Sequence, residues 1–325
     1  LEFRRVLFRS ILKIRNQFSE EKIFDAIASA DHEMFNNGIV AVGDISNASH
    51  SFYTKTRSKI YYHTFIEVFD ISPQRTHEAF SSALNLEREL QQAYLADNPL
   101  THSVTPHAPY SVTEDLFSLI DNYALKNNSL LSIHNQETES ENELFRFRNG
   151  KLFDLMTKFG ADFSSLKTNN HGSLKSTLLR MKHYSKLLLV HNTFTSEEEI
   201  SGVKNNSENI YWCFCPNANL FIEERLPVFG NFTGNEVKCC IGTDSYASNH
   251  SLNMIDEMKT ITRHNPELNF ETILKWGTIN GAEFFNLEKK FGSFEKGKQP
   301  GINLIEHFDT ESLKLSPQSV VKRLI

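Results

Sequence analysis

Short apolar runs alternate with helical segments along most of the chain, and this alternation restricts the possible folds more than any other feature. Seven runs read as strands, near residues 39, 60, 101, 130, 187, 210 and 237. Helical patterns separate them, for example over 73–96 and 114–126, and another follows the last run over 252–264. Strands that alternate with helices predict βαβ units and a parallel sheet. Runs that are apolar throughout predict a sheet covered on both faces. The pattern therefore predicts an α/β fold.

The length of the chain favours one particular α/β architecture. Its 325 residues accommodate a (β/α)8, TIM-like barrel of about 250 residues and an appendage. A closed barrel has eight strands, whereas this sequence has seven and begins with a helical pattern over 19–36. We predict that residues 11–288 form such a barrel without its first strand, which would lie upstream of Ile11. Residues 289–325, with one short strand over Ile302–Glu306, are predicted to be a C-terminal appendage.

Composition limits the classes of partner. Residues 1–10, which lack Met and resemble translated vector sequence, are interpreted as a non-native leader and excluded from the fold. The net charge of −6 gives no basic footprint for nucleic acid. No apolar run approaches the roughly 18 residues needed to cross a bilayer, and we recognise no signal peptide. We expect a cytoplasmic protein that acts on a small molecule, without a nucleic-acid or membrane partner, and leave self-association into a homo-oligomer open.

The four cysteines are not arranged as a structural zinc site. They form one C-x-C and one C-C pair, Cys213 with Cys215 and Cys239 with Cys240, instead of the C-x2-C spacing. We therefore interpret them as small buried residues of two core strands in a reduced protein.

Ligand-type side chains follow four of the apolar runs. They are His107, His134, His191 and Asp244. A (β/α)8 barrel carries its chemistry at the carboxyl ends of its strands, and His and Asp are ligands for a hydrolytic divalent metal. Each residue also has a plainer interpretation: a rigid-loop residue for His107, a satisfied core or surface residue for His134, a buried tautomer for His191 and a helix N-cap for Asp244. The four in order favour a metal site over these alternatives.

Two glutamates complete the candidate site. Glu137 lies three residues after His134, where it can carry a proton between a metal-activated water and a leaving group. A lone H-x-x-E pattern is weak, because it occurs by chance in many helices. Glu67 ends the strand near residue 60; it could contact substrate, but we favour a solvated residue at the strand end.

These residues belong to motifs that resemble a known family. The motifs are Pro-His107-Ala-Pro-Tyr-Ser, His134-Asn-Gln-Glu137-Thr, Val-His191-Asn, Cys215-Pro-Asn-Ala-Asn219 and Gly-Thr-Asp244-Ser-x-Ala-Ser-Asn249. Together they resemble the amidohydrolase superfamily, and within it the branch of S-adenosylhomocysteine/methylthioadenosine deaminases, guanine deaminases and triazine chlorohydrolases. The similarity runs from about residue 20 to the C-terminus.

The resemblance implies a role for each residue. His134 would be a metal ligand, and Asp244 would be both a metal ligand and the general base. Glu137 would be the proton shuttle, His191 would orient the attacking water, and His107 would contact the substrate. The appendage would be the C-terminal part of a small β-sandwich domain.

Two departures from the family pattern bear on the metal. The family has an H-x-H pair at the end of strand one, whereas no two of the 13 histidines here are separated by a single residue. The resemblance therefore implies that this pair lies upstream of the given sequence. If the upstream reading frame encodes no such pair, the protein would instead be a family member that has lost these ligands. Thr101–Ser111 contains no Lys that could bridge two metals. We predict one divalent metal, zinc, with iron as the alternative.

The function implied is hydrolytic deamination of a heteroaromatic, purine-like amine by a metal-activated water. The alternatives are hydrolysis of another C–N or a C–halogen bond on the same scaffold, and a non-catalytic barrel. Zinc sites use three or four protein ligands, and only His134 and Asp244 are predicted here. We therefore expect this chain to bind metal poorly and to be inactive. A barrel that lacks one strand also has two sheet edges with unpaired backbone groups, and we expect these edges to favour aggregation.

Overall fold

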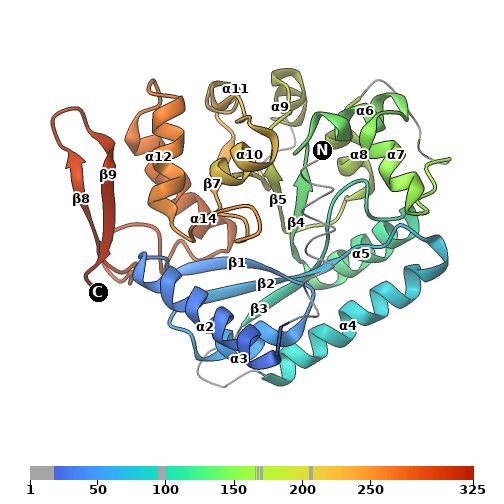
Figure 1. Ribbon diagram of the computed structural model, residues 1–325, viewed down its shortest axis with the longest axis horizontal. Coiled ribbons are helices and arrows are strands. Elements are labelled where there is room, and N and C mark those ends of the chain that lie inside the picture. Colours follow the sequence, from blue (N-terminus) through green and yellow to red (C-terminus); the bar gives the residue numbers. More distant parts are fainter. Residues whose placement is uncertain (1–17, 94–99, 165, 167, 169–170, 205–207) are drawn as a thin grey trace.

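The computed structural model describes residues 18–93, 100–164, 166, 168, 171–204 and 208–325 (Figure 1). The predicted leader, residues 1–10, lies outside this range. Within the described part of the chain, no helix is both long and apolar enough to span a bilayer.

The seven predicted strands are all present. They are β1 (Ala41–Ser46), β2 (Tyr61–Val68), β3 (Thr101–Pro106), β4 (Leu130–Asn135), β5 (Lys186–His191), β6 (Ile210–Phe214) and β7 (Lys238–Ile241). The first three form one parallel sheet in the order β1-β2-β3, and the others form a second parallel sheet in the order β4-β5-β6-β7. The predicted parallel α/β fold is confirmed.

The two sheets continue one another at β3 and β4. The Ser132 N–H donates to Thr105 Oγ1 at 2.8 Å, and the same hydroxyl donates to the Ser132 carbonyl. Beyond them the His134 N–H donates to the His107 carbonyl at 2.9 Å. A threonine side chain thus replaces part of the backbone ladder, and the seven strands follow one another around a single curved wall.

The wall is open between its first and last strands. In the part of the chain that the structure describes, no strand pairs with the outer edge of β1 or of β7. A cavity of about 930 Å³ runs between them, lined among others by Gly43 on β1, Cys240 on β7 and Phe285. For the described residues, this arrangement matches the predicted barrel without its first strand.

The described residues form α-helices before, between and after the strands. They are α2 (Glu20–Asn36), α3 (Phe52–Arg57), α4 (Thr76–Ala93), α5 (Glu114–Asn127), α6 (Glu139–Phe147), α7 (Lys151–Lys158), α8 (Ser173–Arg180), α9 (Glu197–Lys204), α10 (Pro216–Glu223), α11 (Phe229–Gly234), α12 (Met254–His264), α13 (Phe270–Trp276) and α14 (Ile279–Phe284). In α5, Thr113 caps the N-terminus by accepting from the Leu116 N–H, and Leu116, Ile120 and Ala124 are buried on one face. This spacing explains why α5 packs on the sheet.

Alternate residues of each strand supply an outer and an inner core. Ile66, Val104 and Trp212 belong to the larger core that includes buried helix residues. Cys213 and Cys240 belong to the inner cluster, with aromatic residues such as Phe65 and Phe284. All four cysteines are buried and free, as predicted.

The C-terminal tail differs from its prediction. Instead of one strand it forms an antiparallel hairpin, β8 (Asn303–Asp309) and β9 (Lys314–Arg323). The sequence did not predict β9, because this strand contains polar residues and a proline at position 317, which are typical of loops. The Arg323 side chain donates to the Phe35 carbonyl at the end of α2, and Lys259 on α12 donates to the Ser319 carbonyl. The hairpin thus contacts helices on both sides of the opening, and in Figure 1 it lies beside α12.

Candidate active site

The predicted histidines gather at the carboxyl edge of the strands. His134 is the penultimate residue of β4, His191 ends β5, and His107 directly follows β3. The ring centroids of His107 and His134 are 4.9 Å apart, and those of His134 and His191 are 5.3 Å apart. The geometry predicted from the strand ends therefore holds for all three imidazoles.

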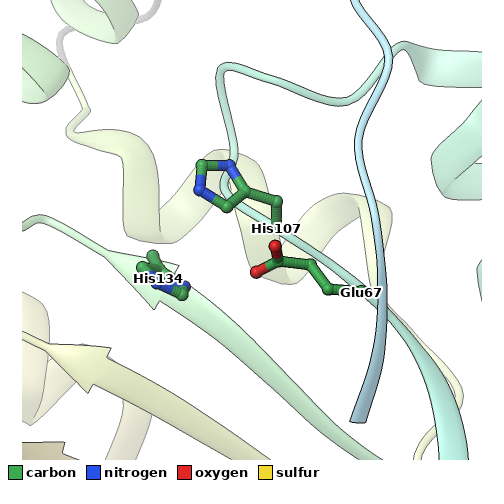
Figure 2. A group of neighbouring side chains, drawn as sticks. All are labelled: Glu67, His107 and His134. Carbon is green, nitrogen blue, oxygen red and sulfur yellow. The ribbon is translucent and has the colours of Figure 1, made fainter. Parts of the chain in front are cut away.

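Glu67 at the end of β2 joins this group. One potential ligand atom from each of Glu67, His107 and His134 lies within 4.8 Å of the others. Figure 2 shows the Glu67 carboxylate pointing toward the two imidazole rings. Two imidazoles and a carboxylate are a donor set that suits zinc and related divalent metals.

The solvated state that we favoured for Glu67 is wrong. Its side chain is partly buried, and burial raises the pKa of its carboxyl to about 7, with a further contribution from the negative charge of Asp244. The sequence signal was present, because Glu67 ends an apolar run as the histidines do. A glutamate at a strand end is common on protein surfaces, and so the run alone did not identify it.

His191 is held in one tautomer. Asn219 donates from Nδ2 to the His191 carbonyl at 3.4 Å, which orients Oδ1 toward the His191 Nδ1 at 2.8 Å. An amide oxygen only accepts, so Nδ1 carries a proton, and in the neutral imidazole Nε2 has the lone pair. Nε2 lies 3.8 Å from Glu137 Oε2. His191 is therefore a buried tautomer, as one alternative proposed, but a side-chain amide holds it and the ring faces a catalytic candidate.

Glu137 is buried, and the residue before it is fixed from several sides. Gln136 adopts a left-handed φ of 45°. Its N–H donates to Glu141 Oε1 at 2.9 Å, and its side-chain amide donates to Asn142 Oδ1 and to the carboxylate of Glu199. These bonds hold the turn after β4 in one conformation, which explains how a loop glutamate keeps its position.

Asp244 follows β7 in a left-handed turn with a φ of 57°. Its carboxylate accepts from the Ser245 N–H at 2.7 Å and from Ser248 Oγ at 2.6 Å. The N-cap alternative is wrong, because the next helix, α12, is capped by Asn253. Asp244 and His134 both line the cavity of about 930 Å³. Asp244 is not a member of the Glu67–His107–His134 group, so its predicted metal role rests on the resemblance.

His107 has aromatic neighbours at the mouth of the site. Its Nδ1 lies 2.6 Å from Ser111 Oγ, and the rings of Phe69 and Tyr110 approach it edge-on at 6.0 and 6.2 Å. Phe69 is about half exposed. The predicted contact between His107 and the substrate stays a prediction, and the nearness of this imidazole to His134 also makes it a candidate metal ligand.

Comparison with known proteins places these residues in a family context. The sequence profile of the amidohydrolase family matches residues 3–323. The chain is 25% identical over 308 residues to a 5'-deoxyadenosine deaminase of Methanococcus vannielii, covering 91% of this chain and 66% of that protein. It is 26% identical to an adenosine deaminase of Helicobacter pylori, covering 86% of this chain and 67% of the relative.

Solved structures of similar fold were also found. A Helicobacter pylori aminofutalosine deaminase superposes with a TM-score of 0.74 at 24% identity, covering 86% of this chain and 68% of that chain. A zinc-bound adenosine deaminase of Xanthomonas campestris gives a TM-score of 0.66 at 21% identity, covering 87% and 61%. At these identities the structures establish the fold. The chain spans 66% of the length of the Methanococcus vannielii relative and 46% of a Thermodesulfovibrio yellowstonii 5-methylthioadenosine/S-adenosylhomocysteine deaminase.

Proposed function

The chain belongs to the amidohydrolase family, and from this premise we propose that it is a metal-dependent hydrolase that deaminates a purine-like heteroaromatic amine. One observation carries the proposal: three imidazoles and two carboxylates converge at the carboxyl edge of the strands. Glu67, His107 and His134 offer ligand atoms within 4.8 Å of one another, and Glu137 lies 3.8 Å from His191. The deaminases among its relatives support the choice of substrate class.

We assign His134 as the central metal ligand, because it belongs to both candidate ligand sets. One set pairs it with Asp244, as the family resemblance implies. The other adds Glu67 and His107, which the geometry favours. Because this second set offers three ligands, we propose that the chain holds the metal, in place of the poor binding and inactivity expected from His134 and Asp244 alone. A divalent cation bound there supplies Lewis acidity and lowers the pKa of water toward neutrality. Zinc is the proposed metal, supported by the zinc-bound neighbours, and iron suits the same donors.

The side chains then have separate tasks in replacing the amine by oxygen. Asp244 accepts a proton from the attacking water, and His191 accepts a hydrogen bond from it at Nε2. Glu137 donates a proton to the leaving nitrogen as the C–N bond breaks and a C–O bond forms. Asp244 then releases the proton that it accepted and Glu137 regains one, so that one proton of the water leaves with ammonia and the other stays on the oxygen-substituted ring. His107 contacts the heteroaromatic ring. Cytoplasmic location, a small-molecule substrate without nucleic acid, and self-association remain predictions.

Ammonia release tests the proposal. The zinc-loaded protein is assayed with 5'-deoxyadenosine, methylthioadenosine, adenosine and a chlorinated triazine, and Glu137→Gln is the control. Ammonia from a purine nucleoside supports deamination, and chloride from the triazine would favour the C–halogen alternative. The same panel on a reading frame extended upstream tests whether an H-x-H pair is needed for activity. Absence of both products from both forms, with no metal bound, would favour a non-catalytic barrel.

A further inference from the structure

A buried carboxylate outside the catalytic group joins two of its loops. Glu257, in the first turn of α12, is fully buried. Its Oε1 accepts from Asn217 Nδ2 at 3.0 Å and from Asn249 Nδ2 at 2.6 Å. Its Oε2 accepts from the Asn217 N–H at 2.9 Å. Three donors from two separate loops therefore converge on one side chain.

The first loop carries Asp244. Asn249 uses its second amide hydrogen to donate to the Thr243 carbonyl at 2.6 Å, directly before Asp244. Asp244 has a φ of 57°, which is costly for a residue with a β-carbon and persists only where its surroundings fix it. Glu257 orients Asn249, and through Asn249 it helps to hold this turn in the left-handed conformation.

The second loop sets the tautomer of His191. Asn217 is the second residue of α10 and, besides its two bonds to Glu257, accepts from Thr260 Oγ1 at 2.5 Å. Two residues later, Asn219 Oδ1 accepts from the protonated Nδ1 of His191 at 2.8 Å. The placement of the first turn of α10 on α12 therefore decides where the Asn219 amide meets the imidazole.

We propose that Glu257 is a positioning residue, which fixes His191 and Asp244 relative to each other for the proposed hydrolysis without contacting substrate or metal. The inference rests on the proposed function for its kinetic consequence only. An apolar side chain could fill the same volume, but it would leave three buried donors without an acceptor, and each such donor costs stability. An ionised carboxylate is an acceptor-only group that satisfies all three and links the two loops. Burial raises the pKa of Glu257 to about 8, whereas the three donors from Asn217 and Asn249 favour the ionised form.

Glu257→Gln is the sharpest variant, because it keeps the shape of the side chain. In either orientation its NH2 faces a donor, either the Asn217 N–H or the two asparagine amides. We expect kcat to fall on the order of 10- to 100-fold, as for outer partners of metal ligands, with a smaller change in KM. The matched control is Asp256→Asn, the neighbouring carboxylate on α12, which pairs with Lys259 and accepts from Ser251. It should retain wild-type kcat.

A second readout needs no substrate and separates this inference from the proposed function. The 15N imidazole shifts of His191 report its tautomer. Glu257→Gln and Asn217→Ala should shift them toward a mixture of tautomers, whereas Asn249→Ala should leave them unchanged and alter the pH profile of kcat. If wild type releases no ammonia on any substrate, the proposed function fails and the shifts still test the positioning role.

If Glu257→Gln does not fold, Asn217→Ala and Asn249→Ala still test the proposal, because each removes the side-chain contact between Glu257 and one of the two loops. Unaltered His191 shifts in Asn217→Ala and Glu257→Gln, together with wild-type kcat where an activity exists, would overturn the proposal. Loss of kcat in Asp256→Asn to the same extent as in Glu257→Gln would also overturn it, because the effect would then belong to α12 as a whole.

Discussion

Histidines at opposite ends of the strands have different surroundings although both emerge from apolar runs. His63, near the start of β2, is buried, with Nδ1 2.8 Å from Thr101 Oγ1 and Nε2 3.0 Å from Ser103 Oγ. Burial lowers its pKa to about 3, helped by positive charge at His102 and Lys55. His134, at the end of β4, is only partly buried and faces a carboxylate and a second imidazole.

The difference shows what turns a strand histidine into a candidate ligand. Hydroxyl groups satisfy both nitrogens of His63, so it is neutral and structural. Glu67 and His107 bring negative charge and further lone pairs to His134, which a cation can use. Position along the strand separates the two cases, because loops at the carboxyl ends supply the additional groups.

The largest effect on turnover is expected from a substitution at the carboxyl ends of the strands. Glu137→Gln should lower turnover on the order of 10²-fold or more, because the amide cannot carry the proton to the leaving group. Zinc content should stay near wild type, which equilibrium dialysis measures. The exposed Glu139→Gln, two residues away, is the control. Turnover equal to wild type in Glu137→Gln would remove this residue from the mechanism.

A smaller effect is expected one step away from the reacting atoms. Asn219→Ala should lower kcat roughly 10- to 100-fold, because His191 loses the acceptor that fixes its tautomer. Asn219→Asp supplies a carboxylate oxygen in the same place and should recover part of the loss. Steady-state kinetics of both variants measure this, and no recovery in the aspartate variant would contradict the role assigned to the acceptor.

The smallest effect on activity is expected from a substitution at the amino ends of the strands, where His63 lies. His63→Gln should leave kcat near wild type but change the pH dependence of stability. The unfolded state gains a proton near pH 6.5, whereas native His63 gains one only near pH 3. The free energy of unfolding therefore falls as pH drops through this window, by about 2 kcal/mol between pH 6.5 and 5.

Urea unfolding at pH 7 and pH 5 measures this change. The histidine's share of the acid destabilisation should be absent in His63→Gln. An equally steep decline in the variant would show that other groups cause the acid sensitivity, and a large loss of kcat would erase the contrast between the two ends.

The sequence identified groups that end apolar runs and missed those whose surroundings come from distant elements. His134 and His191 are positioned by their own strands, so their place could be predicted. Glu257 lies in an amphipathic helix and reads as a solvent-facing residue, because its burial depends on how α12 packs against α10. Asn219 belongs to one of the family motifs, but its partner His191 lies 28 residues away, so the contact could not be predicted. Strand β9 was not predicted, because its polar residues and its proline are typical of a loop.

The most direct test is zinc affinity, measured by chelator competition for wild type, His134→Ala and His63→Gln. The account predicts that His63→Gln binds zinc as wild type does and that His134→Ala loses at least an order of magnitude in affinity, since one protein ligand is removed. Glu67→Gln and Asp244→Asn then decide between the two ligand sets. Unchanged affinity in His134→Ala, with the variant folded, would contradict the assignment of the carboxyl edge as the metal site.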